Sequence, residues 1–141
     1  MTDIDLSVFR KLFFETAKSY VFSLDNSCKK ILLSNNDFEA INQAFISSHS
    51  LKSQSHVMGY SHFANLSGVL EHVFRALKEG KLQYTAPVGE SLGNAVTALR
   101  SSLELLEKSG EDKDNSSIVS QVIDVTGIGY PDYLNQWEYF L

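Results

Sequence analysis

The amino-acid sequence predicts an all-α protein, an antiparallel four-helix bundle with an additional C-terminal helical segment. Two observations support this prediction. Apolar residues recur at spacings of three and four along four long stretches, which is the periodicity of one buried helix face. Short segments with capping residues or glycine join these stretches, and short connections favour antiparallel neighbours. The signal for strands is weak throughout the chain.

The composition agrees with one compact module and excludes several classes of protein. The chain has 141 residues, 43% of them hydrophobic and 11% aromatic, which is sufficient for a core. The net charge of −5, with no basic run longer than Lys29-Lys30, argues against nucleic-acid binding. A lone cysteine, Cys28, fits a reducing compartment. Because no secretory signal pattern is present and no apolar stretch approaches about 18 residues, we expect a cytoplasmic protein.

The first predicted helix covers residues 5–33, with Asp3 or Asp5 available as its cap. Its apolar positions, spaced by three and four, are Leu6, Phe9, Phe13, Ala17, Tyr20 and Leu24. Residues 35–37, Asn-Asn-Asp, then form a loop with capping side chains. The buried side of the second helix is marked by Phe38, Ile41, Phe45, Ser48, Ser55 and Met58. His49 falls at the edge of this face.

The third and fourth helices follow the same pattern. Ser61 is the expected cap of the third helix, which ends at Gly80. Its core positions are Phe63, Leu66, Leu70, Val73 and Leu77. The fourth helix begins near Pro87, a favoured first-turn residue, and ends at Gly110. Its core positions are Val88, Leu92, Ala95, Val96, Leu99, Leu103 and Leu106.

We divide the chain after the fourth helix. Residues 1–110 form the helical bundle, and residues 111–141 form a linker with a C-terminal helical and aromatic segment. The acidic and polar residues of 110–116 have the composition of a solvated linker. A short fifth helix is expected over 118–125. The last residues, 130–141, are unusually aromatic, which suggests either a docked final helix or a chain cut from a longer polypeptide.

The second helix carries a patch of polar side chains that could take part in a reaction. On a helix, positions 49, 52, 53 and 56 lie near one another, so one face holds His49, Lys52, Ser53 and His56 without large side chains. An imidazole nitrogen needs an unobstructed in-line approach to phosphorus, and a neighbouring ammonium stabilises phosphoryl oxygens. The patch therefore indicates a phosphate-accepting surface. An inert surface histidine has the same local pattern, and that interpretation stays open on spacing alone.

Motifs in a fixed order match one known family. The segment His49-Ser50-Leu51-Lys52-Ser53 is similar to an H-x-x-K-G core, and Leu70-Glu71-His72 follows on the next helix. The opening Phe13-Phe14-Glu15-Thr16-Ala17 is similar to the first helix of the same family. On these motifs, residues 13–85 resemble the histidine phosphotransfer domain, most closely the N-terminal phosphorylated domain of chemotaxis-type histidine kinases. This chain has Ser53 where the family often has glycine, and Gly68 where that branch tends to place a second histidine.

The resemblance implies a role for each matching residue. His49 would accept the phosphoryl group, Lys52 would stabilise it, and Glu71 would orient the imidazole. A carboxylate that accepts the Nδ1 proton fixes the tautomer and leaves Nε2 with a free lone pair. Ser53 and His56 would lie on the surface where partners dock.

The implied function is a phosphorelay in two-component signal transduction. His49 would take a phosphoryl group from ATP on a histidine kinase catalytic domain, or from a receiver phosphoaspartate, and pass it to the aspartate of a response-regulator receiver. The sequence has no glycine-rich nucleotide loop and no acidic Mg²⁺ cluster, so ATP and Mg²⁺ are expected from partner domains. The chain would thus be a relay rather than an independent enzyme, and whether it belongs to a larger kinase stays open. The alternative is a helical adaptor module that docks partners without phosphotransfer.

A metal site is a weaker interpretation of the histidines. All four, His49, His56, His62 and His72, fall within one short region. His49 and His56 are two turns apart, about 10 Å along a helix, which is too far for one ion. No metal-ligand motif supports them. We therefore expect no metal, with His56 and His62 as surface or loop residues.

Overall fold

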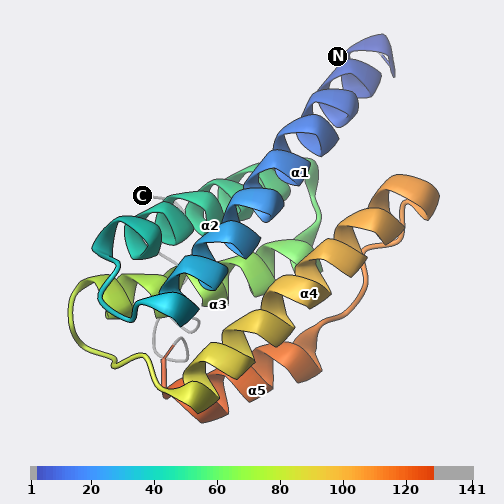
Figure 1. Cartoon of the computed structure of the whole chain (residues 1–141). Coiled ribbons are helices and arrows are strands. Elements are labelled where there is room, and N and C mark those ends of the chain that lie inside the picture. The colour runs from blue at the N-terminus through green and yellow to red at the C-terminus, as the bar shows by residue number, and fades with distance from the viewer. Residues whose placement is uncertain (1–2, 129–141) are drawn as a thin grey trace.

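Residues 3–128, the part of the chain that the computed structural model describes, form five α-helices and no strand (Figure 1). The helices are α1 (Asp3–Leu33), α2 (Phe38–Met58), α3 (Ser61–Lys78), α4 (Ala86–Ser109) and α5 (Ser116–Thr126). The all-α prediction is confirmed. The predicted aromatic segment, 130–141, lies outside the described residues. None of the described helices combines the length and apolar character that crossing a membrane requires.

Helices α1 to α4 form an antiparallel bundle (Figure 1). Each helix packs against its neighbours in the sequence, and α1 packs against α4 to close the bundle. The α2–α3 pair makes the most extensive contact, and α5 lies against α3 and α4. The expected bundle with one further helical segment is therefore observed.

The N-terminal turns of α1 extend past the bundle (Figure 1). Helix α2 has 21 residues against the 31 of α1, so it covers α1 only back to about Phe13, which is 5% exposed. Leu6 and Phe9, which we predicted to be buried, are 56% and 49% exposed. Phe38, another predicted core residue, is 58% exposed because it begins α2 at the outer end of the helix pair. The apolar periodicity identified the buried face of each helix, but it does not show how far along that face the neighbouring helix extends.

The helix ends of α2 and α4 follow the sequence signals. The Asp37 carboxylate accepts a hydrogen bond of 3.0 Å from the backbone N–H of Ala40, as an N-cap residue does. Thr85 caps α4, and Pro87 lies in its first turn. Gly110 ends α4 with a φ of 76°, a left-handed conformation that glycine adopts at little cost.

The start of α3 is capped differently from the prediction. Ser61 is the first helical residue, and Tyr60 occupies the N-cap position without a side-chain hydrogen bond. Instead, the Asp112 carboxylate accepts hydrogen bonds from the backbone N–H groups of His62 (2.8 Å) and Phe63 (3.0 Å). The expectation that Ser61 caps α3 is therefore wrong, because an acidic side chain distant in sequence satisfies these donors.

The fifth helix joins the core of the bundle. Val119 and Val122 belong to the hydrophobic core cluster. Before the helix, Asn115 is buried and donates from Nδ2 to Ser102 Oγ at 2.9 Å. The described part of the predicted linker is thus held to the bundle at Asp112 and Asn115. The division of the chain at residue 110 stays a prediction.

A two-residue turn connects α2 to α3. Gly59 has a φ of 79°, and its N–H donates to His56 O at 3.1 Å. The Tyr60 N–H donates to Ser55 O at 2.9 Å. These two hydrogen bonds form a Schellman motif, which ends α2 in a defined geometry. The turn thereby determines which residues of α2 and α3 face each other.

Candidate functional site

Small side chains make up much of the buried face of α2. The buried face of α2 includes Ala40, Ala44, Ser47, Ser48 and Ser55. The buried Ser48 hydroxyl donates to Ala44 O at 2.8 Å, within its own helix, so no partner on α3 is needed. Helices α2 and α3 share the most extensive contact of the bundle, and a carboxylate from α3 reaches the side chains at the edge of α2.

Three predicted site residues meet at that edge. Glu71 of α3 is fully buried. Its Oε1 contacts Nδ1 of His49, and its Oε2 accepts a hydrogen bond of 2.5 Å from Lys52 Nζ. The His49 side chain is 55% exposed, so its ring reaches solvent while Nδ1 faces the carboxylate. A proton on Nδ1, donated to Glu71, leaves Nε2 as the nitrogen with a free lone pair.

The carboxylate at the centre of the site stays ionised. Burial raises the pKa of Glu71, but the hydrogen bonds from Lys52 and His49 and their charges outweigh burial and hold this pKa below its ordinary value. Arg75, one turn further along α3, adds a guanidinium nitrogen 3.6 Å from Glu71 Oε1. The buried negative charge is therefore surrounded by donors from both helices.

Only part of the predicted polar patch lies on the surface. Ser53 and His56 are exposed on α2, and burial together with the nearby Lys52 charge lowers the pKa of His56. The Lys52 side chain is only 9% exposed, because its ammonium turns inward to Glu71. Lys52 therefore shares a helix face with His49, but its ammonium is directed to Glu71 rather than to solvent.

Three further side chains next to His49 were not predicted. The Phe45 ring is stacked against the His49 ring, with centroids 6.3 Å apart and planes inclined by 28°. Arg75 and Lys78 of α3 lie over the Phe45 ring, at 5.6 Å and 4.9 Å from its centroid. Spacing was the available signal, because Phe45 precedes His49 by four residues and Arg75 follows Glu71 by four.

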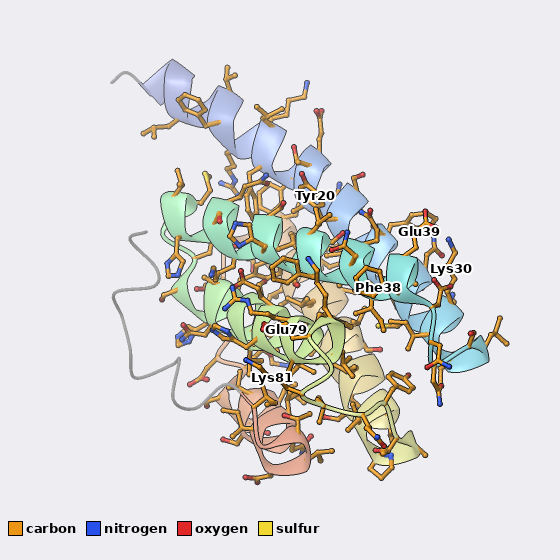
Figure 2. All side chains as sticks on the ribbon, turned by 90° about the vertical axis from the view of Figure 1, so that its left-hand side faces the viewer. Tyr20, Lys30, Phe38, Glu39, Glu79 and Lys81 are labelled. Atoms are coloured by element: carbon orange, nitrogen blue, oxygen red, sulfur yellow. The ribbon has the colours of Figure 1, made fainter. Side chains whose placement is uncertain are left out.

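In Figure 2, α2 and α3 run next to each other across the side of the molecule that is turned to the viewer. Glu79 and Lys81, labelled nearer the middle of the view, follow the end of α3, and Phe38 and Glu39 mark the outer end of α2. His49 lies between that end and the α2–α3 turn.

The other histidines lie apart from this contact. His72 is buried within α3, and His62 is partly buried at the start of that helix. Within residues 3–128, no three histidine, cysteine or acidic side chains come close enough to hold a metal ion.

A helical bundle that presents an imidazole to solvent, with a buried carboxylate behind its Nδ1, has the parts of a phosphoryl-relay domain. The family comparison agrees, since the model of the Hpt domain matches residues 8–113. The chain belongs to the Hpt domain family, and its function is that of a phosphorelay domain.

The chain is similar to chemotaxis proteins of the CheA type. It is 25% identical to the chemotaxis protein CheA of Bacillus subtilis (strain 168) over 124 residues, which are 88% of this chain and 18% of that protein. The chain thus spans less than a fifth of the length of this relative.

Solved structures show the same fold. The phosphorylated P1 domain of CheA3, in a complex with CheY6 from R. sphaeroides, matches with a TM-score of 0.75 at 17% identity, over 82% of this chain and 93% of that one. The solution structure of the histidine phosphotransfer domain of CheA matches with a TM-score of 0.75 at 22% identity, over 89% and 91%. The CheA phosphotransferase domain from Thermotoga maritima gives 0.65 at 22% identity, over 70% and 93%.

Proposed function

We propose that His49 is the phosphoacceptor of this domain. Its Nε2 attacks the γ-phosphorus of ATP held by a separate histidine kinase catalytic domain, the N–P bond forms, and the P–O bond to ADP breaks. The phosphoryl group then passes from Nε2 to the aspartate of a response-regulator receiver, or arrives from such an aspartate in the reverse direction. The observation that carries this proposal is the contact of His49 Nδ1 with the buried Glu71, while the ring is exposed.

The buried carboxylate has two tasks in this reaction. Before the attack, the Glu71 carboxylate accepts a hydrogen bond from Nδ1–H of His49. This bond keeps the Nε2 lone pair directed outward. During the attack the ring gains positive charge, and a pre-positioned carboxylate stabilises that charge without reorganising. Lys52 holds Glu71 Oε2 at 2.5 Å and brings positive charge to the same helical turn as His49. We assign stabilisation of the phosphoryl oxygens to Lys52 as well.

Partners supply what the relay needs. ATP and Mg²⁺ come from the kinase domain, and the acceptor carboxylate comes from the receiver. The complex of the structurally similar CheA3 domain with CheY6 supports a receiver as partner. We place the exposed Ser53 and His56 on the surface that these partners contact, and the reaction in the cytoplasm.

Phosphorylation of the wild-type chain and of His49→Gln tests this function. Each protein is incubated with phosphoramidate, and separately with a chemotaxis-type kinase domain and ATP, and its intact mass is measured. We expect one acid-labile, base-stable phosphoryl group on the wild type and none on the variant. Because His49 is largely exposed, the variant should melt close to the wild type. Equal labelling of both proteins, or no labelling of either with any donor, would refute the assignment.

A further inference from the structure

The contact with Glu71 alone leaves the imidazole incompletely constrained. A single hydrogen bond at Nδ1 sets one direction, but the ring can still tilt about that bond. In-line attack requires the Nε2 lone pair to point along the line to phosphorus. The His49 side chain is 55% exposed, so it is not enclosed by neighbouring side chains that would prevent this tilt.

Phe45 supplies a contact on the face of the imidazole ring. It lies one turn before His49 on α2, and its ring is inclined by 28° to the imidazole at a centroid separation of 6.3 Å. This separation is within the range of offset aromatic pairs. Tilting of the His49 ring toward Phe45 is therefore limited by the Phe45 ring itself.

Two cations from the neighbouring helix hold the Phe45 ring. The Lys78 ammonium lies 4.9 Å and the Arg75 guanidinium 5.6 Å from the ring centroid, both within cation–π range. Arg75 also lies 3.6 Å from Glu71 Oε1, the same oxygen that contacts His49. The contacts thus form a closed circuit from His49 to Phe45, Arg75, Glu71 and back.

We propose that Phe45, held by Arg75 and Lys78, is a positioning residue that fixes the plane of the His49 imidazole for phosphoryl transfer. The inference rests on the proposed function, because the fixed plane matters for a nitrogen that attacks phosphorus. Phe45 takes no part in bond making. Its effect is on the fraction of time that Nε2 is aligned.

The experiment compares ring mobility with reaction rate in matched variants. Phe45→Leu removes the ring, Phe45→Tyr keeps it, and Phe38→Leu makes the same change on the same helix at an exposed position away from the site. Mobility is the order parameter of the His49 ring carbons from ¹³C relaxation. The rate is the initial phosphorylation of His49 by phosphoramidate, which involves no protein docking. Lys78→Met is a second variant, which keeps Phe45 and removes one cation.

The expected result is specific to the ring. Phe45→Leu should lower the order parameter and slow phosphorylation by about 2- to 12-fold, the factor that corresponds to one aromatic pair. Phe45→Tyr and Phe38→Leu should match the wild type, and Lys78→Met should lie between. With a kinase domain as donor, kcat should fall in Phe45→Leu while KM stays unchanged.

Failure of this inference differs from failure of the proposed function. If Phe45→Leu keeps the wild-type order parameter and rate, Phe45 does not position the ring. If Phe45→Leu does not fold, a wild-type order parameter in Lys78→Met overturns the inference. If the order parameter falls as expected but His49 is never phosphorylated in any variant, the positioning contact is real and the phosphoacceptor assignment is wrong.

Discussion

Replacement of Glu71 by glutamine should destabilise the fold as well as disturb the site. Glu71 is fully buried, and its carboxylate binds Lys52, whose side chain is only 9% exposed. Breaking a buried ion pair by removing one partner leaves the other charge poorly compensated. We therefore expect Glu71→Gln to lower the free energy of unfolding by about 3 kcal/mol at pH 7. For a domain of this size, that corresponds to a fall in melting temperature of roughly 10 °C.

At acidic pH, most of the difference in unfolding free energy between the wild type and Glu71→Gln should disappear. The pKa of Glu71 in the folded protein is below its ordinary value of 4.5, so its ionisation stabilises the fold above that value. This contribution is lost as the pH falls below 4.5 through the folded pKa, because protonated Glu71 no longer pairs with Lys52. Wild type and Glu71→Gln should therefore differ fully at pH 7 and converge in acid.

Urea unfolding followed by circular dichroism, at pH 7 and at steps below pH 4.5, measures both effects. Glu107→Gln is the control, since Glu107 forms an exposed pair with Lys18 at 2.8 Å and should lose less than about 1 kcal/mol. The reasoning fails if Glu71→Gln changes stability no more than the control, or if its deficit is the same in acid as at pH 7. The variant should also be phosphorylated more slowly by phosphoramidate, and a normal rate would reject the orienting role.

Two other predictions concern parts of the molecule away from the site. Asp112→Ala removes the cap of α3 and should cost about 1–2 kcal/mol in urea unfolding, whereas Asp124→Ala, on the exposed side of α5, should cost little. Equal effects of the two changes would contradict the capping role. Burial, reinforced by the Asp25 charge, raises the pKa of the partly buried Cys28 thiol to about 12, so thiol reagents at pH 8 should modify it more slowly in the folded than in the unfolded protein. Equal labelling rates of the folded and the urea-unfolded protein, followed by intact mass, would contradict the raised pKa.

The order and limits of the helices could be predicted from sequence because caps and periodicity are local. Asp37, Pro87 and Gly110 act at the ends of their own helices, where the residue type alone is informative. The exposure of Leu6 and Phe9 could not be predicted in this way. It depends on α2 being shorter than α1, which is a relation between two helices.

The site was predictable to the extent that spacing and family resemblance describe it. His49 and Glu71 were predicted to interact, and the structure brings them into contact. The inward turn of the Lys52 ammonium depends on how closely α2 packs against α3, which spacing does not report. The same holds for Arg75, whose contact with Phe45 joins two helices.

Composition misled most clearly in the segment before α5. Its acidic residues are typical of a solvated linker, yet the carboxylate of Asp112 binds two backbone N–H groups of α3. A charged residue at a helix start and a charged residue in a linker look alike in a sequence. Only the fold shows which donors lie within reach.

The Schellman turn at Gly59 has a consequence for how this chain tolerates insertions and deletions. His49 lies about three helical turns before this connection, on α2, and Glu71 about three turns after it, on α3. Their contact therefore depends on the number of residues between each of them and the turn. One residue added between Ser61 and Glu71 would rotate the carboxylate by about 100° around α3 and carry it away from the imidazole. The loop from Glu79 to Thr85 lies beyond both residues, and a change of length there leaves this count unaltered. Length variation among related chains should therefore concentrate in the α3–α4 loop and be rare between residues 49 and 71.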